Sequence, residues 1–94
     1  MKIGHAIKKC RQLKNISLSL LADETGLSKS YLSLVENEKR QISLESLEKV
    51  SSLLDVPLYL LIYLAAEPEE MKEIKGELKT EFDNLLINLI KKNE

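Results

Sequence analysis

Basic and small polar residues stand at both ends of one short helical pattern in the stretch 17–40. Lys29 and Ser30 begin the pattern, and Lys39 and Arg40 follow its end. An ammonium group such as that of Lys29 can donate to the O6 and N7 acceptors of guanine, whereas a serine hydroxyl donates or accepts and discriminates less. Basic side chains in a loop bind phosphate oxygens. The chemistry indicated is contact with nucleic acid, provided that the helix projects from the protein.

The preceding residues supply the elements that would hold such a helix in place. Ser17 and Ser28 each precede a helical pattern and can cap its free N–H groups, and Gly26 lies where the first helix must end. Ala22 permits a close helix crossing. Spacing places four apolar residues beneath that crossing: Leu21, Leu27, Leu32 and Val35. The pattern predicts a helix-turn-helix, whose second helix enters the DNA major groove; an ordinary αα-hairpin is the alternative.

The stretch from about Ile3 to Leu61 resembles the Cro/CI-type (XRE, lambda-repressor-like) helix-turn-helix family. The segments SLSLLA, KSYLS and LEKVSSLLDV are particularly similar to SinR-like repressors. The resemblance implies an all-α, lambda-repressor-like five-helix DNA-binding domain, which we assign to residues 1–66. We expect residues 67–94, which match no motif, to form an additional amphipathic C-terminal helix.

The resemblance also implies which residues contact DNA. Lys29, Ser30 and Leu34 occupy positions from which family members reach base edges, and Leu34 can meet a thymine methyl group. Tyr31 and Ser33 are neighbours able to reach a base or a phosphate. Packing of the Tyr31 ring on the preceding helix is an equally good alternative.

Phosphate contacts are expected on both sides of this helix. Ser17 and the amides that follow it form one anion site, because helix N-termini attract phosphate. Asn37, Lys39 and Arg40 form another, which Ser43 extends.

Three positions bear on how well this module works. Leu18 stands where many members have a phosphate-holding Gln. Glu38 stands where Gly is common, which predicts a strained turn and a negative charge near the DNA; a degenerate module that no longer binds DNA is therefore a further alternative. Arg11 and Glu36 match a structural ion pair of the family, and that pair can also orient Arg11 toward a phosphate.

Charge and composition agree with this interpretation. Residues 1–40 carry eight Lys and Arg against four Asp and Glu, whereas residues 41–94 carry six against eleven. The positive part coincides with the predicted DNA-binding helices.

A single cysteine, Cys10, indicates a reducing, cytoplasmic setting. The longest uncharged stretch, Val56–Ala66, is far shorter than the roughly 20 residues of a membrane span. Because His5 is a lone histidine and no nucleophile–base pair is discernible, we expect no metal, no cofactor and no enzyme activity.

Apolar periodicity predicts helices over Ile3–Lys14, Leu18–Thr25, Lys29–Glu36, Leu44–Leu54, Pro57–Ala66 and Pro68–Lys91. In the first, the buried stripe is predicted to be Ile3, Ala6, Ile7, Cys10 and Leu13. The last two helices carry more apolar side chains than one small core can bury. We expect this surplus to form a homodimer interface comprising Leu60, Tyr63, Leu64, Ile74, Leu78, Phe82, Leu85 and Leu89. Folding of the last helix back onto its own domain is the rival arrangement.

The function predicted from these features is a sequence-specific, DNA-binding transcriptional regulator. We expect a repressor that binds an inverted-repeat operator in double-stranded DNA as a homodimer. The alternative is an antitoxin or partner-controlled interaction module, whose C-terminal helix docks a toxin or an antirepressor.

Overall fold

The computed structural model describes residues 1–70, 83–85, 87–88 and 90–91, and all regular structure among them is helical. Residues 68–70, 83–85, 87–88 and 90–91 are helical. The bounds of the labelled helices are α1 Ile3–Leu13, α2 Leu18–Thr25, α3 Lys29–Glu36, α4 Leu44–Leu54 and α5 Leu58–Ala65. The all-α prediction is therefore confirmed. Within these described ranges, no helix is long and apolar enough to cross a membrane.

Among α1 to α5, the observed bounds differ from the predicted ones at α1 and α5. Most of the sixth predicted helix, Pro68–Lys91, lies outside the described residues. α1 ends at Leu13, one residue early. Pro57 was predicted to lie within the first turn of α5, but it is the N-cap residue, with φ −56° and ψ 143°. The extended ψ leaves its carbonyl to accept the N–H of Leu60 at 2.9 Å, so the helix proper begins at Leu58.

Serine caps fix where three of the helices begin. The hydroxyl oxygens of Ser17, Ser28 and Ser43 each accept the backbone N–H three residues further on, at 3.0, 3.0 and 3.1 Å. Each cap satisfies a donor that the helix itself cannot pair. At the far end of α2, Gly26 adopts φ 74°, a left-handed conformation that costs glycine little. α2 thus begins and ends on local signals, and α3 and α4 begin on them.

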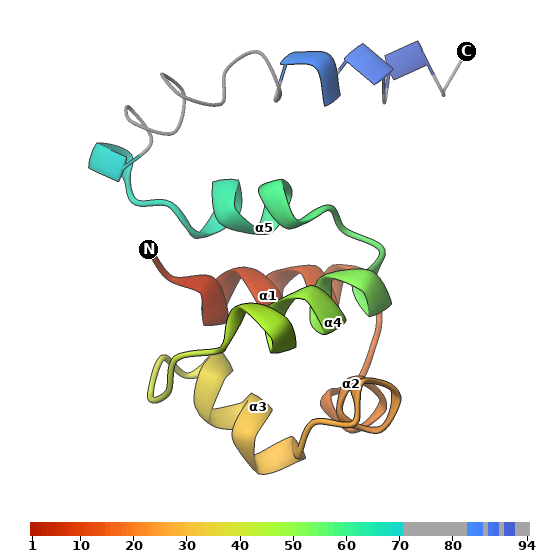
Figure 1. Cartoon of the computed structure of the whole chain (residues 1–94), viewed down its shortest axis with the longest axis vertical. Helices are drawn as coiled ribbons and strands as arrows, with labels where there is room; N and C mark the ends of the chain where they lie inside the picture. Colours follow the sequence, from red (N-terminus) through yellow and green to blue (C-terminus); the bar gives the residue numbers. More distant parts are fainter. Residues whose placement is uncertain (71–82, 86, 89, 92–94) are drawn as a thin grey trace.

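α1 is the central helix of the domain. It contacts α3, α4 and α5, with α2 and α3 on one side of it and α5 on the other (Figure 1). The fully buried side chains come from all five helices: Ile7, Leu21, Leu32, Val35, Val50, Leu54 and Leu61. Cys10 is part of this core, and burial raises the pKa of its thiol. Cys10 therefore acts as a small apolar residue here.

Leu13 does not belong to the core, and its predicted place on the buried stripe of α1 is wrong. Its side chain is 73% exposed. At 3.6 residues per turn it lies about 60° round the helix from Cys10, on the edge of the apolar stripe. The chain also leaves the helix here, because Asn15 turns into the left-handed region with φ 57°.

The first turn of α1 lies directly against the end of α3. A Cβ atom added to Gly4 would stand 1.8 Å from the carbonyl oxygen of Val35, far inside the closest approach of two non-bonded atoms. On its other side, the start of α1 is tied to the end of α5, because the N–H of Lys2 donates to the carbonyl of Ala65 at 2.8 Å. These contacts fix the position of α3 relative to the rest of the domain.

Candidate nucleic-acid interface

The amino end of α3 is exposed in the described part of the chain. Lys29 and Ser30 are both exposed, and Leu34, one turn further along the same face, keeps 43% of its surface open. Ser33 is half-buried. The structure therefore presents the start of α3 outward, as entry into a groove requires.

α2 supports α3 from beneath. Leu21 and Ala22 of α2 and Leu32 of α3 are buried in the shared core, with Leu27 of the turn half-buried against them. Leu18, which replaces the phosphate-holding Gln of many relatives, is half-buried and packs on the same core. At this position the chain has an apolar support in place of a polar anchor.

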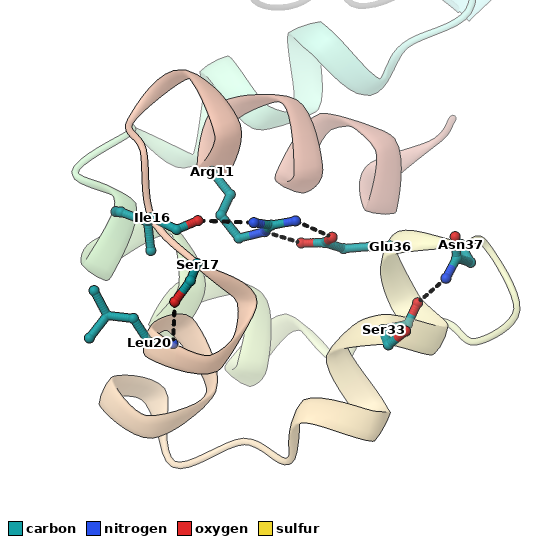
Figure 2. Close-up of polar contacts among 7 residues, drawn as sticks. All are labelled: Arg11, Ile16, Ser17, Leu20, Ser33, Glu36 and Asn37. Atoms are coloured by element: carbon teal, nitrogen blue, oxygen red, sulfur yellow. Dashed lines mark hydrogen bonds and ion pairs between the residues drawn. The ribbon is translucent and has the colours of Figure 1, made fainter.

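The candidate phosphate ligands flank α3. Ser17 and Ser43 use their oxygens as cap acceptors, which leaves each hydroxyl hydrogen free to donate outward. Asn37 donates from Nδ2 to the Ser33 carbonyl at 2.9 Å (Figure 2), so its side chain is held along the last turn of α3. Lys39 is exposed. These donors come from three segments: the N-cap of α2, the loop that follows α3 and the N-cap of α4.

The guanidinium of Arg40 lies over the ring of Tyr31. The guanidinium carbon lies 5.2 Å from the ring centroid, a distance typical of a cation–π contact. Tyr31 is half-buried and packs against the core. The Tyr31 ring therefore contacts both the core and a basic side chain of the loop after α3, and its contact with a base or a phosphate stays a prediction.

Arg11 and Glu36 form the expected ion pair, with good two-point geometry (Figure 2). Nε of Arg11 donates to Oε2 of Glu36 at 2.8 Å, and Nη2 donates to Oε1 at 3.0 Å. A third bond joins Nη1 to the carbonyl of Ile16 at 2.9 Å. The hydrogen bond to Glu36 raises the pKa of Arg11 above its ordinary value. The pair ties α1 to α3 and to the segment that leads into α2.

The guanidinium of Arg11 is directed into the domain, and its predicted orientation toward a phosphate stays a prediction. The Arg11 side chain is 12% exposed, and its guanidinium faces Glu36 and Ile16 within the domain. The carboxylate pairs with the Nε/Nη2 edge and the Ile16 carbonyl with Nη1, so three of the five guanidinium N–H donors are used within the domain. The role of Arg11 is to fix the arrangement of the helices.

Glu38 has the left-handed backbone expected at a glycine-favoured position, with φ 59°. Its carboxylate, however, does not face α3. Oε1 accepts the backbone N–H of His5, in the first turn of α1, at 2.9 Å. Sequence reasoning missed this contact, and the only available signal was an acidic residue at a position where Gly is usual.

Four of the expected dimer-interface residues are described, and three of them lie on α5. Leu60 is half-buried, while Tyr63 and Leu64 are 38% and 46% exposed. Leu85 is half-buried in the C-terminal segment. The other four expected interface residues, Ile74, Leu78, Phe82 and Leu89, lie outside the described residues. Figure 1 shows α5 on the side of α1 that faces away from α3.

Comparison with known proteins places this arrangement in a family. Residues 7–61 match the family described as "Helix-turn-helix". The HTH-type transcriptional regulator SinR of Bacillus licheniformis is 41% identical over 85 residues, which cover 89% of this chain and 73% of that protein. A crystal structure of SinR in complex with DNA matches with a TM-score of 0.61 and 46% identity, covering 64% of this chain and 97% of the other.

A structure of a SinR protein/SinI protein complex also matches, with a TM-score of 0.63 and 33% identity over 98% of this chain and 99% of the other. The family match spans more than half of the chain, and the relatives share both its sequence and its helix arrangement. The chain therefore belongs to the helix-turn-helix family of transcriptional regulators and is similar to SinR.

Proposed function

We propose that residues 1–66 bind double-stranded operator DNA, with α3 in the major groove and the flanking donors on phosphates. The observation that carries this proposal is the exposed, serine-capped start of α3, which presents Lys29 and Ser30 outward. A cation at a helix N-terminus is unfavourable for the helix itself, because the macrodipole is positive there. The position of Lys29 therefore favours contact with an anionic ligand and does not favour the stability of α3.

Selection of bound sequences from a random duplex pool, at one stated salt concentration, tests this proposal. A palindromic motif with half-sites about one helical turn apart is expected, since a symmetric dimer presents two α3 helices to one face of DNA. Failure to enrich any sequence would refute DNA recognition. A single, non-repeated motif would support recognition but contradict the symmetric arrangement.

Replacing Lys29 with alanine is expected to weaken operator binding by about 10- to 100-fold, the value of one good base contact. The free energy of unfolding should stay within about 0.5 kcal/mol of the wild type, because the residue is exposed. Fluorescence anisotropy with a labelled operator and urea denaturation measure the two quantities.

The matched control for that variant is Lys49→Ala, which removes the same charge from α4. Lys49 is 51% exposed and lies 3.9 Å from Glu45. Equal losses of affinity in the two variants would mean that only net charge matters, and would contradict base contact by Lys29.

We further propose that the apolar face of α5 and residues 67–94 form the homodimer interface, with repression as the outcome of operator binding. Support comes from the exposed side chains of Tyr59, Tyr63 and Leu64 on α5. α5 lies on the side of α1 opposite α3 (Figure 1). A dimer joined there leaves both copies of α3 free for DNA.

The dimer proposal is tested by sedimentation equilibrium of the full chain and of Leu64→Lys. A charge placed at the centre of an apolar interface is expected to raise the dimer dissociation constant by about tenfold or more. The control is Leu13→Lys, which changes an exposed leucine at the end of α1. The proposal is refuted if the wild type is a monomer at tens of micromolar, or if both variants dimerise as it does.

A second function, partner-controlled docking through residues 67–94, is favoured by one observation. The match to the SinR protein/SinI protein complex extends over 98% of this chain, beyond the helix-turn-helix. A toxin or an antirepressor seated on the C-terminal helix would then compete with the dimer. Co-expression with the product of a neighbouring small reading frame tests this, and a stable heterodimer that releases operator DNA is the supporting result.

The same proposal assigns the chain no enzymatic activity and no cofactor, and places it in the cytoplasm. The absence of a nucleophile–base pair from the sequence supports the first assignment, and a single core cysteine with no disulfide partner supports the last.

A further inference from the structure

Glu38 occupies a backbone conformation that a glutamate does not favour. α3 ends in a Schellman motif: the N–H of Glu38 donates to the carbonyl of Val35 at 3.0 Å, and that of Lys39 donates to the carbonyl of Leu34 at 2.8 Å. The motif places Glu38 at φ 59°. Asn15 and Asp55 adopt the same sign of φ at their helix ends, but their short side chains tolerate it. A glutamate there persists only if something else holds it.

The side chain of Glu38 is held by a hydrogen bond to the first turn of α1. Lys2, the N-cap residue of α1, provides no side-chain cap. Glu38 replaces that cap from 33 residues away, because its Oε1 accepts the N–H of His5 at 2.9 Å. A carboxylate at a helix N-terminus is also favoured by the macrodipole. The carboxylate therefore compensates for the strained backbone and directs its charge to α1 rather than to α3.

The loop that follows is fixed at a second point. Arg40 lies over the ring of Tyr31 at 5.2 Å from its centroid. Lys39 stands between these two contacts, one residue from each. The two expected phosphate donors of the loop are therefore carried on a segment attached to α1 at one end and to α3 at the other.

We propose that Glu38 is a positioning residue for DNA binding, whose contact with α1 fixes the loop that presents Lys39 and Arg40 to phosphate. This inference rests on the DNA-binding function proposed above. The simplest expectation for an acidic residue beside DNA is that loss of its charge raises affinity by relieving repulsion. The positioning role adds that loss of its contact with α1 lowers affinity.

The test uses two substitutions that remove the same charge. Glu38→Gln keeps the length of the side chain and an oxygen able to accept from His5. Glu38→Asn is one methylene shorter and tolerates the left-handed backbone better. Operator affinity is measured across a range of salt concentrations, at a temperature well below the unfolding transition of each variant, together with hydrogen exchange at the His5 amide.

We expect Glu38→Gln to bind at least as tightly as the wild type, with the His5 amide still protected. Glu38→Asn is expected to expose that amide and to bind about fivefold more weakly than Glu38→Gln, the size of one lost anchoring bond. Its plot of log affinity against log salt should be shallower by about one unit, because a phosphate contact is lost. A change in thermal stability alone would not alter that slope.

Equal affinity and equal salt dependence of the two variants would overturn the positioning role while leaving the DNA-binding function intact. Loss of His5 protection in Glu38→Gln as well, with affinity unchanged, would overturn it too. If the wild type itself enriches no duplex from the random pool, the proposed function fails and this inference fails with it.

Discussion

Glu36→Ala is expected to lower the free energy of unfolding by about 3–5 kcal/mol, the usual cost of removing one partner from a buried ion pair. Glu36 is 4% exposed and Arg11 is 12% exposed, so water cannot replace the lost carboxylate around the guanidinium. The variant leaves a buried cation whose remaining bond is to the carbonyl of Ile16. Since a domain of this size is stable by roughly 5–15 kcal/mol, a large fraction of its stability is at risk.

The double variant Arg11→Met/Glu36→Leu is the control for that prediction. Replacement of a whole buried pair by apolar side chains of similar size is often close to neutral. Urea denaturation of Arg11→Met, of Glu36→Leu and of the double variant gives the coupling energy directly. A loss below about 1 kcal/mol in Glu36→Ala would mean that the pair is hydrated and contributes little.

Operator affinity is a second measurement on the double variant, and it separates an effect on helix orientation from an effect on stability. The pair joins α1, α3 and the segment that enters α2, so it sets the angle at which α3 is presented. A double variant that is as stable as the wild type but binds operator more weakly would assign the pair to helix orientation. Equal binding would assign it to stability alone.

Local signals account for what could be predicted from the sequence. Ser17, Ser28 and Ser43 were identifiable as caps because each precedes an apolar pattern of helical period, and each is a cap in the structure. Gly26 was identifiable as a turn for the same kind of reason. The predicted burial of Leu13 was wrong because this residue lies at the edge of the apolar stripe of α1, where a small rotation about the helix axis exposes the side chain.

Contacts between distant segments could not be predicted in the same way. The bond from His5 to Glu38 joins residues that share no sequence pattern, and it exists only because α1 and α3 meet at their ends. The position of Arg40 over Tyr31 likewise depends on how the loop after α3 folds back. For Arg11 the pair itself was predictable by resemblance, but the inward direction of the guanidinium followed from the Ile16 carbonyl.

Gly4→Ala is expected to destabilise the domain by about 3 kcal/mol or more, which is the upper part of the range for overpacked sites. The new Cβ would lie 1.8 Å from the carbonyl oxygen of Val35, 2.8 Å from its carbonyl carbon and 2.9 Å from Oε1 of Glu38. Two of these three atoms belong to backbone, so no side-chain rotation relieves the clash. The ends of α1 and α3 must separate, which also breaks the bond between Glu38 and His5.

Whether Gly4→Ala raises or lowers the free energy of unfolding distinguishes close packing at this site from the intrinsic helix propensity of alanine. In a helix that packs on nothing, alanine is more stable than glycine by about 1 kcal/mol, so an unobstructed Gly4 would give a stabilised variant. Gly26→Ala is the matched control, because a Cβ there meets no atom within 4 Å and suffers only from φ 74°. We expect it to cost about 1–2 kcal/mol. Thermal and urea denaturation rank the two, and a Gly4→Ala protein as stable as the wild type would contradict the close approach of α1 to α3.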